Sequence, residues 1–295
     1  MPNPFAQPGE WLKGNLHAHT TNSDGWMSPQ YTVRAYAAMD YDFLALTDHM
    51  LFTDPRELDP CGLTLVRGAE VDAPVGPIGQ SLHVVALGLD QVPQWPEGAS
   101  APEFMAAVAA QCMACFAAHP SWSLLEGADL LPLEGYLGVE VYNQICDHMG
   151  RGYSELQWDA LLARGRTRWG LAVDDCHFPQ SIGRGWIVLR SAQRSEAAIL
   201  AALRAGHFYA TRGPLLEGLS LEGDKLRVAC SPCREAAVLS AAEGSGWTTG
   251  IVPHLRRPFT QVALPIQNRE AWLRVELWDE RGRKAWSNPF HLDEL

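Results

Sequence analysis

The chain has 295 residues, 47% of them hydrophobic, and a formal net charge of −11 at pH 7. This length allows one large domain, or a medium-sized and a small domain, each with its own hydrophobic core. No apolar run approaches the ~18 residues that would span a bilayer, and the acidic balance argues against a nucleic-acid polymer as partner, because binding a phosphate backbone requires several cations.

The number of cysteines indicates the cellular compartment of the protein. There are seven cysteines, an odd number, and the N-terminus lacks the basic-then-apolar segment of a secretion signal. We therefore expect free thiols and a cytoplasmic location. The two C-x-x-C pairs, Cys112/Cys115 and Cys230/Cys233, are interpreted as buried structural thiols rather than as a zinc site.

Short apolar runs alternate with amphipathic segments from the start of the chain to about residue 190. This alternation predicts a parallel sheet with helices outside, and seven strands favour a closed or nearly closed (β/α)7 barrel over an open doubly wound sheet. The expected strands lie at 12–18, 43–47, 63–71, 82–89, 115–120, 137–143 and 169–175, and the expected helices begin at Ser28-Pro29, Ala101-Pro102, Ser154 and Ser195.

The pattern of the sequence changes after Pro214. Short segments of alternating apolar and polar residues, separated by Gly, Pro and Asn, predict antiparallel strands joined by hairpins. We therefore expect an α/β barrel domain at residues 1–214 and a small antiparallel β-sandwich domain at residues 215–295. The two should pack together, because no flexible linker separates them.

Polar residues gather at the carboxyl ends of the predicted strands, which in a parallel barrel meet on one face, where ligand sites are built. Five of the ten histidines lie at these ends. Residues i and i+2 of a strand point the same way, so His17 and His19 aim together into the barrel mouth, and Asp175 and His177 repeat this arrangement. The predicted metal ligands are His17, His19, Asp24, His49, Glu70, His83, His119, Asp175 and His177.

Imidazole and carboxylate ligands without a necessary thiolate suit zinc, manganese or iron. Nine side chains, at three or four per ion, imply two or three divalent ions, and Glu70 can bridge two of them. The alternative reading, hydrogen-bonded core residues, fits a single buried histidine better than this group. Each uncompensated imidazole or carboxylate in an apolar barrel would cost several kcal/mol.

His83 and Asp174 need a further argument. His83 begins its apolar run, so parallel geometry would place it on the wrong face of the barrel. A hairpin between residues 63–71 and 82–89 would return it to Glu70, and we expect that hairpin. Asp174 should face away from its neighbour, so it is interpreted either as a support for the ligands or as a general base.

Substrate contacts are predicted from cations and donors near the barrel mouth. Arg184 and Arg212 suit bidentate contact with phosphate or carboxylate, and they join Asp175 and His177 in the predicted catalytic set. The alternative for each arginine is a structural ion pair with an acidic neighbour. Further substrate-contact candidates are Trp186, Asn143, His148 and Arg151, whereas His207, His254 and His291 are interpreted as structural or surface residues.

At these residues the sequence resembles the polymerase-and-histidinol-phosphatase (PHP) superfamily of metallohydrolases. This likeness spans residues 12 to about 214. A narrower likeness, to the carbaryl-hydrolase-like (CehA/McbA-type) branch, extends over nearly the whole chain. Asp40 departs from it, since the family often has Gly there, and this affects a turn rather than chemistry. The superfamily's motifs are matched in order and spacing by NLHAHTTNSDG (15–25), DFLALTDH (42–49), GAE (68–70), LHVVALG (82–88), AHP (118–120) and DDCH (174–177), and the branch by EVYN, GRGWIVLR, GHFYATRGP and AWSNPF.

The resemblance implies a distorted seven-stranded barrel with a two- or three-metal site. It also implies that one carboxylate, Glu70, is shared between ions. The implied ligand sets are His17, His19, Glu70 and Asp175 for one ion, Asp24, His49 and His177 for a second, and Glu70, His83 and His119 for a third.

The leading hypothesis is a metal-dependent hydrolase of PHP type, a phosphoesterase in which a metal-bound hydroxide attacks a small phosphate mono- or diester. One alternative is a carbamate or carboxylic ester hydrolase that uses the same site. A second is a metal-binding module without turnover. The two arginines favour phosphate, and the complete ligand set disfavours a module that has lost its chemistry.

Overall fold

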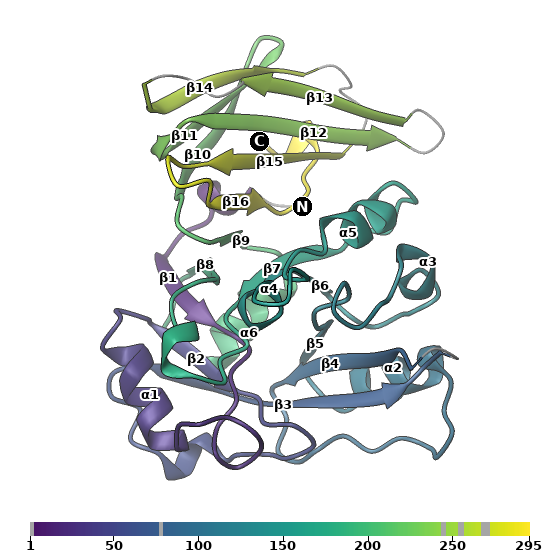
Figure 1. Ribbon diagram of the computed structural model, residues 1–295. Coiled ribbons are helices and arrows are strands. Elements are labelled where there is room, and N and C mark those ends of the chain that lie inside the picture. The colour runs from purple at the N-terminus through teal and green to yellow at the C-terminus, as the bar shows by residue number, and fades with distance from the viewer. Residues whose placement is uncertain (1–2, 77–78, 243–245, 253–256, 267–271) are drawn as a thin grey trace.

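The computed structural model describes residues 3–76, 79–242, 246–252, 257–266 and 272–295. His254 lies outside these ranges. Within them a 13-stranded sheet runs through the molecule, and a three-stranded sheet lies against one end of it (Figure 1). Among the described residues, every helix is too short or too polar to cross a membrane.

The first seven strands lie side by side in the order in which the chain makes them. All seven predicted strands are present, and β3 pairs with β4 in antiparallel orientation, as the expected hairpin requires; β4 also pairs with β5 in antiparallel orientation, which departs from the otherwise parallel sheet that was expected. The cause is local, because a short hairpin with no helix joins β3 to β4. The strands are β1 (Glu10–Asn15), β2 (Phe43–Leu46), β3 (Thr64–Pro74), β4 (Ser81–Leu87), β5 (Ala114–Ala117), β6 (Gly138–Asn143) and β7 (Trp169–Val173).

The sheet curves so that β1 and β7 approach each other beyond their carboxyl ends. Ala18 and Cys176 form a parallel bridge there, and His19 N donates to Cys176 O at 2.9 Å. β8 (Trp186–Ser191) occupies the free edge of β1 along its length, and β9 (Phe208–Thr211) pairs with β8. The α/β class is therefore confirmed. The described strands are not hydrogen-bonded into a closed ring, so the predicted (β/α)7 barrel is not confirmed.

Helices begin and end where their capping residues predict. Ser28 and Ser195 each accept a hydrogen bond from the backbone three residues on. Gly165 and Gly206 follow helices with positive φ angles of 70° and 74°. The helices are α1 (Pro29–Ala37), α2 (Ala101–Ala109), α3 (Gly127–Leu130), α4 (Gln144–Asp147), α5 (Glu155–Leu162) and α6 (Glu196–Arg204), with 3-10 turns η1 (Pro4–Ala6), η2 (Pro55–Glu57), η3 (Pro179–Ser181) and η4 (Leu292–Glu294).

After residue 214 the chain forms antiparallel strands, as expected. β12, β13, β15 and β16 extend the large sheet, which they join through the pairing of β16 with β9. β10, β11 and β14 form the second sheet. Apolar side chains of both sheets share one core. The predicted boundary at residue 214 falls between β9 and β10, within this connected architecture. These strands are β10 (Leu216–Glu222), β11 (Lys225–Cys233), β12 (Glu235–Ala242), β13 (Gly246–Val252), β14 (Phe259–Pro265), β15 (Trp272–Trp278) and β16 (Lys284–Ser287).

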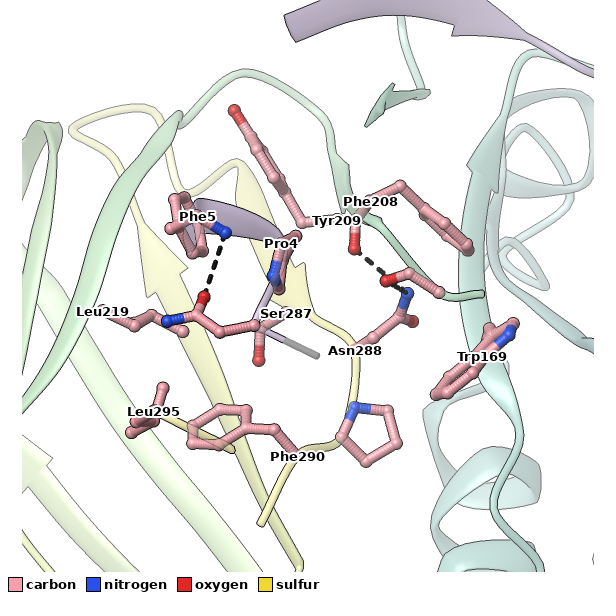
Figure 2. Close-up of a pocket in the computed structure, with 13 residues that line it drawn as sticks. Pro4, Phe5, Trp169, Phe208, Tyr209, Leu219, Ser287, Asn288, Phe290 and Leu295 are labelled. Carbon is pink, nitrogen blue, oxygen red and sulfur yellow. Dashed lines mark hydrogen bonds between the residues drawn. The ribbon is translucent and has the colours of Figure 1, made fainter. Parts of the chain in front are cut away.

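Polar and apolar contacts hold the two parts together. Arg274 of β15 is fully buried, and its guanidinium contacts Asp159 of α5 at 2.6 Å and Glu276 at 2.5 Å. Figure 2 shows the boundary between the two parts beside β9, where Phe5 and Phe290 line a cavity of about 20 Å³. That space holds about one water molecule, so it is not a substrate pocket.

Candidate metal centre

Four buried donor atoms from three different parts of the chain lie close to one another. His17 Nε2 lies 3.1 Å from His19 Nε2 and 3.2 Å from Glu70 Oε2. Asp175 Oδ1 lies 3.3 Å from His17 Nε2 and 3.0 Å from His19 Nε2, and His19 Nε2 lies 3.2 Å from Glu70 Oε2. Separations of this length allow ligand atoms to share an ion, because Zn–N and Zn–O bonds are about 2.0–2.2 Å long.

The hydrogen-bond partners of these residues leave the four atoms available to a cation. His17 Nδ1 lies 2.6 Å from Glu140 Oε1, and because a carboxylate only accepts, this nitrogen carries the proton. The lone pair of Nε2 then faces two carboxylates and a second imidazole. Glu70 Oε2 and Asp175 Oδ1 are buried and accept no hydrogen bond from the described residues. One shared positive ion satisfies all four donors, so the residues fit a divalent metal.

Glu70 also faces a second group of donors with its other oxygen. Its Oε1 lies 2.9 Å from His83 Nδ1 and 3.2 Å from His119 Nε2. The antiparallel pairing of β3 with β4 brings His83 to this position, as the hairpin prediction required. The two oxygens of one carboxylate thus point into two neighbouring donor groups, the arrangement of a bridging ligand.

A third group lies nearer the surface. His177 Nδ1 donates to the carbonyl oxygen of Asp175 at 2.9 Å, which leaves its Nε2 facing Asp24 Oδ2 at 3.2 Å. His49 Nε2 lies 3.7 Å from Asp24 Oδ2, and the side chain of Asp24 is 54% exposed. His19 belongs to this group as well as to the first, through a separation of 3.5 Å between its Nδ1 and Asp24 Oδ1.

The structure therefore brings all nine predicted ligands together, as side chains that form overlapping groups. Two of them adopt a backbone conformation that side chains rarely take, with φ angles of 29° at His119 and 48° at Asp175. Such strain persists only where the surroundings impose it, and it is common at functional sites. Here it turns the chain sharply after β5 and β7, so that both side chains enter the centre.

Burial and mutual charge shift the pKa values in the centre. Burial lowers the pKa of His19, but the adjacent carboxylates of Asp175 and Glu70 outweigh it and raise the pKa to about 9. Burial raises the pKa of Glu70, but the charge of His17 and the neighbouring imidazoles hold it well below its usual value. Both shifts have one cause, the close pairing of buried imidazoles with buried carboxylates, in which each charged form stabilises the other.

Glu140 is the main residue that the sequence reasoning missed. It is fully buried in β6, and besides His17 it accepts hydrogen bonds from the backbone N–H of His119 and from Asn143 Nδ2, each at 2.8 Å. A carboxylate that binds the second nitrogen of a metal-ligating histidine fixes its tautomer and its orientation. The available signal was a Glu inside the otherwise apolar segment GVEVY.

Two further acids near the centre were also missed. Asp48, next to His49, accepts four hydrogen bonds, from Thr20 N and from the hydroxyls of Thr20, Ser23 and Thr53, at 2.6–2.8 Å. It fixes the loop that carries Asp24. Asp72 pairs across the hairpin with His83 and joins His49 and His83 in a further donor group.

Asp174 faces away from the centre, as its alternation with Asp175 predicted. Its carboxylate accepts hydrogen bonds from the backbone N–H groups of residues 183–185 at 2.8–2.9 Å and from Tyr36 OH at 3.0 Å. Burial raises its pKa to about 6, although these backbone groups oppose the rise. Asp174 therefore positions the loop after β7 and does not reach the ligand side as a general base.

Neither predicted arginine lines the metal pocket. Arg184 is exposed, and its Nε donates to Gln180 O at 3.4 Å. Arg212 lies 4.1 Å above the ring of Tyr142, hydrogen-bonds to Tyr153 OH and pairs with Asp147 at 3.4 Å. Arg212 therefore fits the alternative interpretation, a structural arginine paired with an acidic neighbour.

The other candidate substrate contacts are occupied elsewhere or exposed. Asn143 Nδ2 donates to Asp175 Oδ2 at 3.0 Å as well as to Glu140, so it supports the ligands. Lys13 lies over the ring of Trp186, and His148 is exposed and contacts Gln144. The last of these candidates, Arg151, is exposed. Of the histidines interpreted as structural or surface residues, His207 is half-buried and His291 is exposed.

The metal centre opens into a pocket of about 230 Å³. Its lining combines metal donors with apolar side chains from α4, from the turn after α4 and from the loop after β5. The donors are Asp24, His49, His83, His119, Asp175 and His177, and the apolar side chains are Trp122, Ile145, Cys146 and Met149.

Comparison with known proteins supports the family expectation over part of the chain. Residues 162–208 match a family model described as PHP-associated. This segment contains β7, Asp175 and His177, and it covers less than half of the chain. No curated protein matches the chain.

Among solved structures, the chain is similar to a two-domain protein from Bacteroides vulgatus that contains a predicted PHP-like metal-dependent phosphoesterase. The two share 18% sequence identity over 95% of each chain, with a TM-score of 0.53, which shows a common fold that includes the sheet-rich second part. Shorter matches are an amidohydrolase from Chromobacterium violaceum (32% identity over 26% of this chain and 28% of that chain, TM-score 0.24) and a protein from Bifidobacterium adolescentis assumed to be a metal-dependent phosphoesterase (16% identity over 58% of this chain and 90% of that chain, TM-score 0.37).

Proposed function

We propose that this protein is a metal-dependent phosphoesterase of PHP type that hydrolyses a small phosphate mono- or diester, using two or three ions of zinc, manganese or iron. One observation carries the proposal: Glu70 directs its two oxygens into two adjacent groups of metal donors. Adjacent ions suit phosphoryl transfer, because together they contact both the attacking and the leaving oxygen of an in-line displacement.

Divalent ions bound here supply a nucleophile from water at neutral pH and neutralise charge on the phosphate oxygens. The residues of the chain prepare that chemistry. Glu140 keeps the proton of His17 on Nδ1, and the carbonyl of Asp175 does the same for His177, so both Nε2 atoms present lone pairs. Asn143 holds the outer oxygen of Asp175 at 3.0 Å, which aims the inner oxygen at the donor cluster.

The surroundings support a small-molecule substrate. The pocket of about 230 Å³ is large enough for one compact organic group beside the ions. The fold likeness to a protein with a predicted PHP-like phosphoesterase and the PHP-associated segment around Asp175 and His177 are consistent with this assignment. The narrower likeness to the carbaryl-hydrolase-like branch is part of the proposal.

A carbamate or carboxylic ester hydrolase is the second candidate. It is favoured by one observation, that no lysine or arginine among the described residues lines the pocket, since Arg212 is held by Asp147 and Tyr153. A neutral carbonyl substrate requires no protein cation, whereas a phosphate dianion gains from one. With a phosphate substrate, the metal ions themselves would neutralise the negative charge.

The deciding experiment is metal analysis combined with parallel assays on p-nitrophenyl phosphate, bis(p-nitrophenyl) phosphate and an aryl N-methylcarbamate. We expect at least two ions per chain and faster turnover of a phosphate ester. His17→Gln should abolish turnover, and His207→Gln, outside the centre, should preserve it. Turnover of the carbamate alone would establish the second candidate, and bound ions without turnover of any ester would indicate a non-catalytic metal-binding module.

A further inference from the structure

Arg212 connects the sheet-rich part of the chain with the part that carries the metal donors. It directly follows β9, and its backbone N–H donates to the carbonyl oxygen of Lys284 in β16 at 2.8 Å. Its main chain therefore belongs to the junction between β9 and β16. Its guanidinium reaches into the other part, where it lies 4.1 Å from the ring centroid of Tyr142 in β6. The side chain is only 19% exposed, so these contacts are not those of a surface arginine.

The guanidinium of Arg212 holds the end of α4. It pairs with Asp147, the last residue of α4, at 3.4 Å, and it also hydrogen-bonds to Tyr153 OH. A carboxylate is unfavourable at the C-terminus of a helix, and the positive charge of Arg212 offsets this effect at Asp147. Because α4 has four residues, too few for a stable isolated helix, its position depends on contacts of this kind.

The other end of α4 holds a predicted metal ligand. Asn143 is the N-cap of α4, and its Oδ1 accepts from Cys146 N at 3.1 Å. Its Nδ2 donates to Asp175 Oδ2 at 3.0 Å and to Glu140 Oε2 at 2.8 Å. The inner oxygen of Asp175 lies 3.0 Å from His19 Nε2 in the donor cluster. The orientation of this carboxylate therefore depends on where α4 places Asn143.

Asp175 is sensitive to its neighbours because its backbone is strained. Its φ angle of 48° is one that side chains rarely adopt, and such a conformation persists only where the surroundings impose it. A movement of α4 would lengthen the bond from Asn143 and allow the carboxylate of Asp175 to rotate. Outer partners that orient metal ligands typically contribute about 10- to 100-fold in metal affinity, so this rotation should be measurable.

We propose that Arg212 is a positioning residue of the metal centre: it fixes α4, and α4 fixes Asp175 through Asn143. The sheet-rich part then contributes to metal binding, although all nine predicted ligands come from residues before 214. The inference goes beyond the proposed function, because it concerns how the ions are held and applies to any ester that the centre hydrolyses.

The test measures zinc affinity by competition with a chelating dye, and the visible spectrum of the cobalt-substituted protein, which reports ligand geometry. We expect Arg212→Met to weaken the tightest zinc site about tenfold, the lower end of the range for outer partners, and to change the cobalt spectrum. Arg212→Lys keeps a positive charge beside Asp147 and should restore most of the affinity. Asp147→Asn removes the same ion pair from its other side and should reproduce the loss, which keeps the test decisive if Arg212→Met does not fold.

Arg168→Met is the matched control, because Arg168 has similar surroundings without a contact to α4. It lies 4.5 Å over the ring of Tyr136, pairs with Glu134 at 3.4 Å and is 15% exposed. It precedes β7, so it lies at the opposite end of that strand from Asp175. Arg168→Met should leave both the zinc affinity and the cobalt spectrum unchanged.

A double-mutant cycle separates positioning through Asn143 from a general loss of stability. In a protein that already carries Asn143→Ala, Arg212→Met should weaken zinc binding little further, because the two residues act along one path. In the metal-free protein, the side-chain amide resonances of Asn143 should shift in Arg212→Met and stay in place in Arg168→Met, a readout that requires neither ion nor ester. Wild-type zinc affinity in both Arg212→Met and Asp147→Asn, or fully additive losses in the cycle, would overturn the proposal.

Discussion

Glu140→Gln is the most informative single substitution in this protein, because it changes one atom in a buried, fully occupied hydrogen-bond site. One oxygen of Glu140 accepts from His17 Nδ1, and the other accepts from His119 N and from Asn143 Nδ2. A glutamine has only one oxygen, so its NH2 group must face a donor on one side or the other.

Both orientations of the glutamine are unfavourable. If the NH2 group faces His17, the imidazole must move its proton to Nε2, and the lone pair that points into the donor cluster is lost. If it faces the other side, two buried donors lose their acceptor, which costs about 1–3 kcal/mol. Outer partners of metal-ligating histidines typically contribute about 10- to 100-fold in metal affinity, or about 1.4–2.8 kcal/mol.

The measurement is zinc affinity by competition with a chelating dye, with zinc stoichiometry as a second readout. We expect Glu140→Gln to weaken the tightest site 10- to 100-fold. Glu97→Gln, the same change at an exposed carboxylate, should leave affinity unchanged. Thermal unfolding of the metal-free proteins checks that the variant folds. An affinity equal to that of the wild type would refute the argument that Glu140 sets the tautomer of His17.

Further substitutions test other parts of the structure. Glu70→Ala should remove more than one equivalent of metal, because its oxygens serve two donor groups, whereas His83→Ala should remove at most one; equal losses by elemental analysis would contradict a bridging role. Prolonged dialysis against EDTA should abolish esterase activity, and zinc, manganese or iron should restore it; activity that persists at undetectable metal content would exclude a metal centre. Arg274→Met should lower the free energy of unfolding in urea by about 3–5 kcal/mol, because Asp159 and Glu276 stay buried without their partner, while Arg281→Met at an exposed position should change it little.

Much of the candidate centre could be predicted from the sequence because its ligands come in pairs with strand spacing. His17 with His19, and Asp175 with His177, lie two residues apart at strand ends, and the structure places all four within the overlapping donor groups. Even His83 could be placed, since a hairpin was the only path that returned it to Glu70. Apolar runs and capping serines likewise predicted the first seven strands and the main helices.

The residues that could not be predicted are those whose role depends on distant neighbours. Glu140 looks like an isolated acid in an apolar strand, and only its 2.6 Å contact across 123 positions to His17 shows what it does. Arg212 has the chemistry of a phosphate ligand, but the stacking on Tyr142 and the ion pair with Asp147 turn it away from the pocket. Neither contact has a local signature.

By itself, the sequence determined the α/β class, the sheet-rich C-terminal part and the identity of the clustered donors, because strand periodicity and residue chemistry are local properties. Tertiary structure alone decided how those donors divide, with Glu70 shared between groups and Asp24 at the exposed edge. It also decided that β8 occupies the edge of β1 that a closed barrel would need, and that Trp122 and Met149 line the same pocket as the donors. Such features depend on which segments meet in space, and hydrophobic periodicity carries no information about that.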